Sequence, residues 1–172
     1  HRLRLPFPLS KPQVMGQAFI ERCFQNKSKG FLHAVCGAGK TEMCLSTILE
    51  AMNQGLSIVF VIPRVEIIKQ VIKRFNAYFP RSHIVGLYQN QPWDESADVY
   101  VSTPQQLIKF YQEFDLVIID EADAFPFYQN EYLLRLVEKA RKKDGVMIYI
   151  SATMPKPYQD MIDALGFDDC LI

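Results

Sequence analysis

The stretch F-L-H-A-V-C-G-A-G-K-T, residues 31–41, decides the fold of this chain. Its first part, residues 31–35, is a short apolar run that predicts a buried strand. The run ends in a turn with two glycines, a lysine and a threonine, within residues 36–41. Apolar residues then recur at helical spacing through residues 43–52, which predicts a helix directly after the turn. The sequence therefore predicts a strand–turn–helix unit with a glycine-rich turn.

This turn has the residues of a phosphate-binding loop. Its glycines allow backbone N–H groups to turn inward around an anion, and the helix N-terminus adds partial positive charge. Lys40 can reach the β- and γ-phosphates of a nucleotide, and the Thr41 hydroxyl can bind Mg²⁺. Ala34 stands where the common pattern has its first glycine, so the pattern is the looser A-x-x-G-x-G-K-T; the alternative is a glycine turn with a chance Lys-Thr pair. The expected ATP-binding residues of the loop are Gly37, Ala38, Gly39, Lys40 and Thr41.

The alternation of strand and helix continues along the chain. Strands that are apolar throughout must be covered on both faces, so the pattern predicts an α/β fold with a mostly parallel sheet sandwiched by helices. Residues 1–12, rich in Pro and Arg, are expected to form an N-terminal arm, and residues 13–172 one domain. The further expected strands are 57–62, 83–87, 98–101, 114–119 and 146–150, and the further helices 14–26, 65–79, 104–112, 131–142 and 155–165.

Composition narrows the class of protein. The chain has 172 residues, which suggests one domain, with 49% hydrophobic and 22% charged residues. This composition is typical of a soluble globular protein and excludes a disordered or fibrous chain. Nineteen basic residues balance nineteen acidic ones, so a nucleic-acid site must be local. The apolar runs are too short to span a bilayer, and no pair among the four cysteines has C-x-x-C spacing, so a cytosolic chain without a zinc site of its own is expected.

A second motif, Asp-Glu-Ala-Asp at residues 120–123, supplies the acids that a nucleotide site needs. Four apolar residues, 116–119, lead directly into Asp120, which places it at the carboxyl edge of the sheet, where open α/β folds bind ligands. Asp120 would hold Mg²⁺, and Glu121 would polarise an attacking water. Adjacent carboxylates repel each other, so both stay ionised when a cation lies nearby; the alternative is a solvated acidic loop. The candidate catalytic residues are Lys40, Asp120 and Glu121, and the candidate Mg²⁺ ligands are Thr41 and Asp120.

Three motifs in this order resemble the first RecA-like domain of superfamily 2 helicases and translocases. They are residues 34–41, residues 120–123 and the Ser-Ala-Thr triplet at 151–153. Smaller similarities lie at residues 9–13, L-S-x-x-Q, and at residues 102–107, S-T-P-x-x-L. The resemblance implies a RecA-like P-loop NTPase fold that uses ATP and Mg²⁺. It also implies a second RecA-like domain, absent from this chain, in the full-length protein.

The resemblance also implies roles for individual residues. Gln13 would read the adenine edge; the alternative is a solvent-facing residue at a helix start. The hydroxyls of residues 151–153 would couple to Asp123; the alternative is a helix cap. Basic residues 64–81 are alternatively a solvated helix face. The implied coupling residues are Asp123, Ser151 and Thr153, and the implied contacts to the backbone of one nucleic-acid strand are Pro63, Arg64, Thr103 and Pro104.

Within superfamily 2, the chain departs from the DEAD-box RNA helicases although residues 120–123 spell D-E-A-D. Residues 63–68 and 103–106 lack that family's usual residues, and a basic residue does not follow the tetrad. Residues 33–43 and 120–126 are similar to bacterial competence ATPases, a family tied to uptake of transforming single-stranded DNA. Replication-restart helicases are a more distant match. The competence resemblance implies single-stranded DNA and DNA-uptake proteins as partners, a cytoplasmic location that reaches the membrane only through partners, and a zinc module before the motor.

The sequence thus predicts the ATP-binding motor domain of a DNA-dependent ATPase that translocates single-stranded DNA. An arginine finger supplied by a second domain is worth about 10³–10⁵ in rate, so this chain alone should be a weak ATPase. One alternative is another superfamily 2 motor, a replication-restart or RNA helicase. The other is a binding module in which ATP acts as a switch and nothing is translocated.

Overall fold

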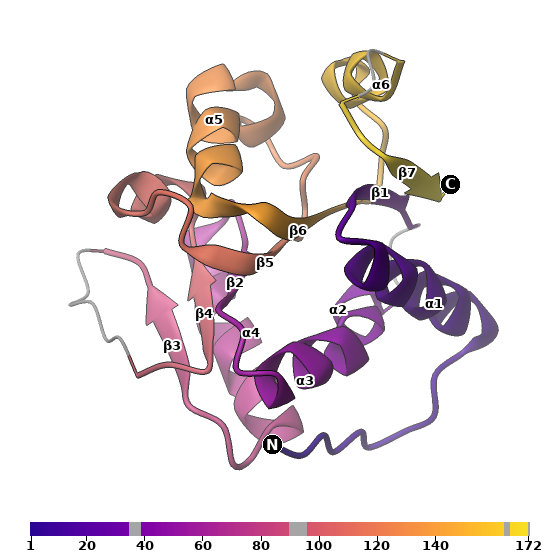
Figure 1. The fold of residues 1–172 in the computed structure, drawn as a ribbon, viewed down its shortest axis with the longest axis vertical. Helices are drawn as coiled ribbons and strands as arrows, with labels where there is room; N and C mark the ends of the chain where they lie inside the picture. Colours follow the sequence, from indigo (N-terminus) through magenta and orange to yellow (C-terminus); the bar gives the residue numbers. More distant parts are fainter. Residues whose placement is uncertain (35–38, 90–95, 164–165, 172) are drawn as a thin grey trace.

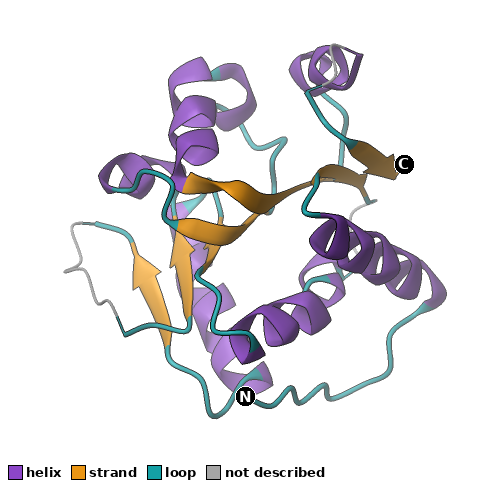
Figure 2. Cartoon of the chain, viewed as in Figure 1, coloured by secondary structure: helices purple, strands orange, loops and turns teal. Residues whose placement is uncertain are grey.

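The structure is a computed structural model that describes residues 1–34, 39–89, 96–163 and 166–171. One seven-stranded sheet runs through the chain, with helices on both faces (Figures 1 and 2). Every strand pair is parallel, and the strand order is β3-β4-β2-β5-β6-β1-β7. The predicted α/β class with a parallel sheet is therefore confirmed. The strands are β1 (Lys29–His33), β2 (Ile58–Val61), β3 (Ile84–Leu87), β4 (Val99–Ser102), β5 (Phe114–Ile119), β6 (Arg141–Ser151) and β7 (Asp169–Leu171).

Helices divide into two layers, one on each face of the sheet (Figure 1). One layer packs on the face that presents Ile58 and Phe60 of β2, and the other on the face that presents Val59 and Val61. Successive residues of a strand point to opposite faces, so a strand apolar throughout serves both layers. The first layer holds α1 (Lys11–Asn26), α3 (Leu45–Asn53) and α4 (Val65–Tyr78), and the second holds α5 (Glu131–Ala140), α6 (Lys156–Asp163) and the 3₁₀ turns η1 (Pro104–Lys109) and η2 (Phe127–Gln129); the short α2 (Lys40–Met43) joins the first.

Several element boundaries differ from the predicted ones. The expected helix at 104–112 is a 3₁₀ turn that ends at Lys109. The expected helix at 131–142 ends at Ala140, and strand β6 begins at once. Lys139 lies at this junction and donates to the carbonyls of Leu107, Ile108 and Phe110 at 3.2, 3.2 and 2.5 Å. These tertiary contacts, which periodicity does not reveal, satisfy the end of η1 and fix where α5 stops.

The remaining differences lie at the ends of the chain and after the phosphate loop. Helix α1 begins at Lys11, inside the expected arm, with Pro12 in its first turn. The arm packs along the domain, where the Arg4 backbone N–H donates to the Tyr78 carbonyl at 2.8 Å. The expected helix at 43–52 divides at Cys44 into α2 and α3. Strand β7 was not predicted, since three half-buried residues carry no clear pattern.

Among the described residues, no helix combines the length and apolarity needed to cross a bilayer.

Tyr158 ties α6 to the loop that follows β5. Its ring is fully buried against Phe31 and Tyr149, with ring centroids 5.4 and 5.6 Å away. Its hydroxyl donates to the Ala122 carbonyl at 2.5 Å. The acidic motif at 120–123 is thereby held by a side chain from the last helix.

We predict that Tyr158→Phe lowers the free energy of unfolding by about 1–3 kcal/mol, because the buried Ala122 carbonyl loses its hydroxyl donor. Urea titration followed by circular dichroism measures the change. The matched control is Tyr132→Phe, at a residue 58% exposed, which should stay within about 0.5 kcal/mol. Equal unfolding midpoints for Tyr158→Phe and the unchanged chain would contradict this role of the hydroxyl.

Candidate functional site

Four loops meet at the carboxyl edge of the sheet. Strands β2, β5, β6 and β1 are successive neighbours and run in the same direction. Parallel strands end at the same edge, which is where ligands bind in open α/β sheets. The chain that leaves these strands carries Arg64, Asp120, Ser151 and Lys40, respectively. Tertiary structure therefore brings together residues from all three predicted motifs.

The described part of the phosphate loop begins at Gly39; the predicted ligands Gly37 and Ala38 lie outside the described residues. Gly39 has a left-handed backbone (φ 64°), and a Cβ there would lie 2.0 Å from the Gln13 side-chain nitrogen. The left-handed backbone favours glycine, and any larger residue would also displace the Gln13 amide. Lys40 follows as the first residue of α2, and Thr41 is buried one residue later. A strand, β1, thus ends at His33 before the predicted loop, and a helix begins at Lys40.

Gln13, in the first turn of α1, forms a hydrogen bond with the phosphate loop. Its amide oxygen accepts from the Ser10 backbone N–H at 2.8 Å, and its amide nitrogen donates to the Gly39 carbonyl at 3.3 Å. The residue is buried, so it is not the solvent-facing side chain of the alternative interpretation. Both the oxygen and the nitrogen of the Gln13 side-chain amide thus form hydrogen bonds within the chain. The adenine-reading role of Gln13 remains a prediction that would require these bonds to be shared or exchanged.

Glu42, directly after Thr41, anchors α2 to α4. It is 3% exposed, accepts a hydrogen bond from the Tyr78 hydroxyl at 2.7 Å and pairs with Arg74. Burial raises the pKa of Glu42, but the Tyr78 hydrogen bond and the Arg74 charge outweigh it, so the pKa lies below its ordinary value. The sequence analysis gave Glu42 no role and treated Arg74 as part of a basic stretch. The signal was present: Arg74 and Tyr78 are four residues apart, on one helix face.

Asp120 lies directly after β5. Its backbone N–H donates to the Val61 carbonyl at 2.9 Å, and its carboxylate accepts from the Glu121 backbone N–H at 2.8 Å. Burial raises the pKa of Asp120 to about 6, against the opposing influence of the Glu121 N–H and the Lys40 charge. A carboxylate that is costly to ionise favours a bound cation beside it. The donor chemistry of Asp120 and Thr41, hard oxygen atoms near a phosphate loop, fits Mg²⁺.

Glu121 is held by Arg64, which follows β2. Arg64 Nε donates to Glu121 Oε2 and Arg64 Nη2 to Glu121 Oε1, both at 2.7 Å. The backbone of Glu121 is left-handed, with φ 54°, a conformation that few side chains adopt. Arg64, Glu121, Lys40, Asp123 and the exposed Phe125 are among the residues that line a cavity of about 350 Å³. The sequence analysis placed Arg64 and Glu121 in separate sites, whereas the structure joins them.

Asp123 and the 151–153 triplet meet as the resemblance implies. Thr153 donates to Asp123 Oδ2 from its backbone N–H at 3.1 Å and from its hydroxyl at 2.9 Å. Burial raises the pKa of Asp123, but the Thr153 hydrogen bonds outweigh it and leave the pKa below its ordinary value. The buried Ser151 hydroxyl bonds to the backbone of Thr153 instead of Asp123. The triplet is therefore linked to Asp123 through Thr153.

The other candidate strand contacts differ in accessibility. Pro63 is half-buried, whereas Thr103 and Pro104 are buried at the end of β4. The Ser102 hydroxyl donates to the Thr103 carbonyl at 2.8 Å. Arg64 is thus the exposed member of this set. Their contact with a nucleic-acid strand stays a prediction.

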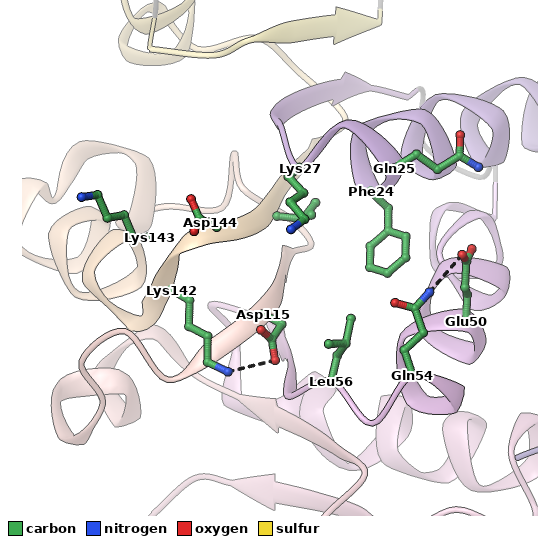
Figure 3. Close-up of a pocket in the computed structure, with 11 residues that line it drawn as sticks. Phe24, Gln25, Lys27, Glu50, Gln54, Leu56, Asp115, Lys142, Lys143 and Asp144 are labelled. Carbon is green, nitrogen blue, oxygen red and sulfur yellow. Dashed lines mark hydrogen bonds and ion pairs between the residues drawn. The ribbon is translucent and has the colours of Figure 1, made fainter.

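A second cavity, of about 530 Å³, lies at the opposite, amino edge of the sheet (Figure 3). Four of its charged and polar side chains form two pairs. Lys142 bonds to Asp115 at 3.1 Å, and Gln54 bonds to Glu50 at 3.2 Å. Among the residues that the structure describes, none of the predicted site residues lines this cavity.

Fold and site together define the class of protein: an N-terminal RecA-like domain of the superfamily 2 helicase type. The chain belongs to the family described as type III restriction enzyme, res subunit, whose model matches residues 9–156. A solved structure, the Sulfolobus solfataricus SWI2/SNF2 ATPase core domain, matches with a TM-score of 0.74 at 16% identity. The match covers 96% of this chain and 34% of the Sulfolobus chain, and it supports the fold.

Two curated relatives are more similar in sequence. The competence protein ComFA of Bacillus subtilis is 36% identical over 149 residues, covering 86% of this chain and 32% of the relative. ComFA of Streptococcus pneumoniae is 37% identical over 122 residues, covering 71% of this chain and 28% of the relative. This chain therefore spans about a third of the length of these relatives. The predicted resemblance to the competence ATPases is confirmed.

We predict that Tyr78→Phe lowers the free energy of unfolding by about 1.5–3 kcal/mol, because buried Glu42 loses a hydroxyl donor to its charge. Urea titration at several pH values measures the change. A lowered pKa means that ionised Glu42 stabilises the fold above its ordinary pKa of 4.5, and this contribution is lost as the pH falls through the folded-state pKa. The difference between variant and unchanged chain should therefore shrink in acid.

The control for Tyr78→Phe is Tyr111→Phe, because Tyr111 is 72% exposed. A difference between Tyr78→Phe and the unchanged chain that does not vary with pH would contradict the part assigned to the Glu42 charge.

Proposed function

We propose that this chain is the ATP-binding motor domain of a DNA-dependent ATPase that translocates single-stranded DNA in bacterial transformation. The observation that carries the proposal is the cavity at the carboxyl edge, which Lys40, Arg64, Glu121 and Asp123 line together. In this proposal, one reaction uses the lysine of the phosphate loop, the acidic residues after β5 and the arginine after β2. The similarity to ComFA supports the link with transformation.

In this proposal, each residue of the nucleotide site has one task. Lys40 binds the β- and γ-phosphates of ATP, and the N-terminal backbone of α2 faces the phosphates. Thr41 and Asp120 hold Mg²⁺, which when bound would neutralise charge on the phosphates. Glu121 orients the attacking water and acts as the general base that attracts its proton. Catalysis consists mainly of positioning and charge stabilisation, because phosphoryl transfer requires little covalent chemistry from the protein.

Single-stranded DNA would pass beside this site, across Arg64 and the end of β4 at residues 103–104. Contacts to phosphates carry no sequence information and weaken with salt. The Thr153–Asp123 link would relay the state of the nucleotide to the strand. A second RecA-like domain in the full-length protein would complete the cleft, and DNA-uptake proteins would bring this cytoplasmic domain to the membrane.

Two other functions remain to be separated by experiment. A replication-restart or RNA helicase would use the same residues on a different nucleic acid, so competition between DNA and RNA single strands distinguishes it. An ATP-switched binding module would bind nucleotide without sustained turnover. Single-strand-stimulated turnover in the full-length protein would exclude the module.

We predict that Lys40→Ala abolishes ATP binding or turnover in the full-length protein, because the phosphates lose their lysine contact. Equilibrium binding of a fluorescent ATP analogue and phosphate release are the measurements. Lys143→Ala, an exposed lysine at the opposite edge of the sheet, is the matched control and should change neither. Unchanged turnover in Lys40→Ala would rule out the phosphate-loop assignment.

We predict that Glu121→Gln keeps ATP affinity and loses turnover by roughly 10²–10⁴-fold, the range of a general-base contribution. The amide preserves the shape of the side chain but is a poor proton acceptor. Analogue binding and single-strand-stimulated phosphate release are compared in the full-length protein, with the exposed Glu131→Gln as control. If binding fell as far as turnover, Glu121 would be a binding residue.

A further inference from the structure

The loops after β2 and β5 are joined by a single bidentate ion pair between Arg64 and Glu121. Both carboxylate oxygens of Glu121 accept from the guanidinium at 2.7 Å. The proposed function assigns each partner a separate task, Arg64 on a strand phosphate and Glu121 on the attacking water. The ion pair therefore holds together two side chains that the proposed reaction uses separately.

We propose that Arg64 is a positioning residue that keeps Glu121 inactive until a phosphate of the single strand takes the guanidinium in its place. This inference rests on the proposed function and assigns a regulation to the same site. ATP hydrolysis is then faster when the strand is bound, because the strand releases the carboxylate that orients water. Arg64 thus links strand binding to turnover through one exchange of partners.

The exchange follows from the geometry of the groups. A guanidinium binds a carboxylate and a phosphate through the same planar fork of N–H donors, so Arg64 can hold one of them bidentately at a time. Glu121 has a left-handed backbone, and its backbone N–H donates to the Asp120 carboxylate at 2.8 Å, a contact that does not involve the Glu121 side chain. Release therefore needs a change of side-chain partner only, with the loop in place.

The exposure of the pair suits a contact that opens. The Arg64 side chain is 49% exposed and that of Glu121 is 27% exposed. Exposed ion pairs contribute little, which corresponds to about a two- to fivefold preference for the closed form, and the bidentate geometry of this pair favours the upper end of that range. Strand phosphates reach the exposed guanidinium from solvent, and each one carries a full charge. Glu42 differs from Glu121 in this respect: its side chain is 4% exposed and also accepts from the Tyr78 hydroxyl, so its pair with Arg74 would not yield to such a competitor.

The first test measures ATP turnover in the full-length protein with and without oligothymidylate. Arg64→Ala should raise turnover without DNA about two- to fivefold, the closed-form preference that it removes. Its stimulation by the strand should fall. Turnover without DNA that is equal to or below that of the unchanged protein would overturn the inference. Arg135→Ala, which removes an exposed arginine paired with Glu131 on α5, is the control and should leave both rates unchanged.

The second test measures strand binding alone, with fluorescent oligothymidylate and no nucleotide. Glu121→Gln frees Arg64, so it should tighten binding about two- to fivefold, whereas Arg64→Ala should weaken binding and flatten its salt slope by about one unit. In an Arg64→Ala background, Glu121→Gln should have no effect. If it tightens binding equally in both backgrounds, the carboxylate acts by simple repulsion of the strand, and the inference is wrong.

A further variant separates failure of this inference from failure of the proposed function. Lys40→Ala tests the nucleotide site without touching the ion pair. If Lys40→Ala loses turnover while Arg64→Ala shows no gain without DNA, the ATPase assignment stands and the regulation by Arg64 is rejected. If Lys40→Ala keeps full turnover, the proposed function itself fails. Arg64→Lys, which keeps the charge but lacks the planar fork, should resemble Arg64→Ala in turnover without DNA.

Discussion

The parallel hydrogen bonding of β5 between β2 and β6 is the constraint on which the rest of the structure depends. It pairs Ile119 with Val61 on one side and with Tyr149 on the other. Three loops therefore leave the sheet at one edge, and β1 adds the phosphate loop beside β6. In this register, a common cavity is lined by Arg64, by Glu121 and Asp123 of the acidic tetrad, and by Ala152 of the 151–153 triplet. A different strand order would leave the same motifs intact in sequence and separated in space.

Polar contacts of buried side chains then hold the loops and the short helix of the site in place. Gln13 fixes the described end of the phosphate loop to α1, and Glu42 fixes the short α2 to α4. A four-residue helix has little stability of its own, so these contacts and the packing of α2 maintain its position. Tyr158 does the same for the acidic loop. Residues that hold the fold together thus lie next to residues with a proposed role in the reaction. Glu42, which contacts α4, directly follows Thr41, a proposed Mg²⁺ ligand.

The contact between Arg64 and Glu121 gives the site its distinctive electrostatics. Asp120 is costly to ionise because burial raises its pKa to about 6, whereas Glu121 has its charge balanced by a guanidinium. Two adjacent carboxylates therefore stand in different surroundings. Asp120 favours a bound cation, whereas Glu121 is already paired with the Arg64 guanidinium of another loop. This difference suits the separate roles proposed for them, a Mg²⁺ ligand in Asp120 and a residue that orients water in Glu121.

The amino-acid sequence predicted the α/β class, the parallel sheet and an acidic tetrad directly after a strand, because each depends on local order: an apolar run, or an acid at its end. It missed the short β7, the end of α5 at Ala140 and the 3₁₀ form of η1, which depend on contacts such as those of Lys139. Only the tertiary structure decided which side chains meet. Arg64 and Glu121 are 57 residues apart, and no local pattern specifies such a pair; the strand order does.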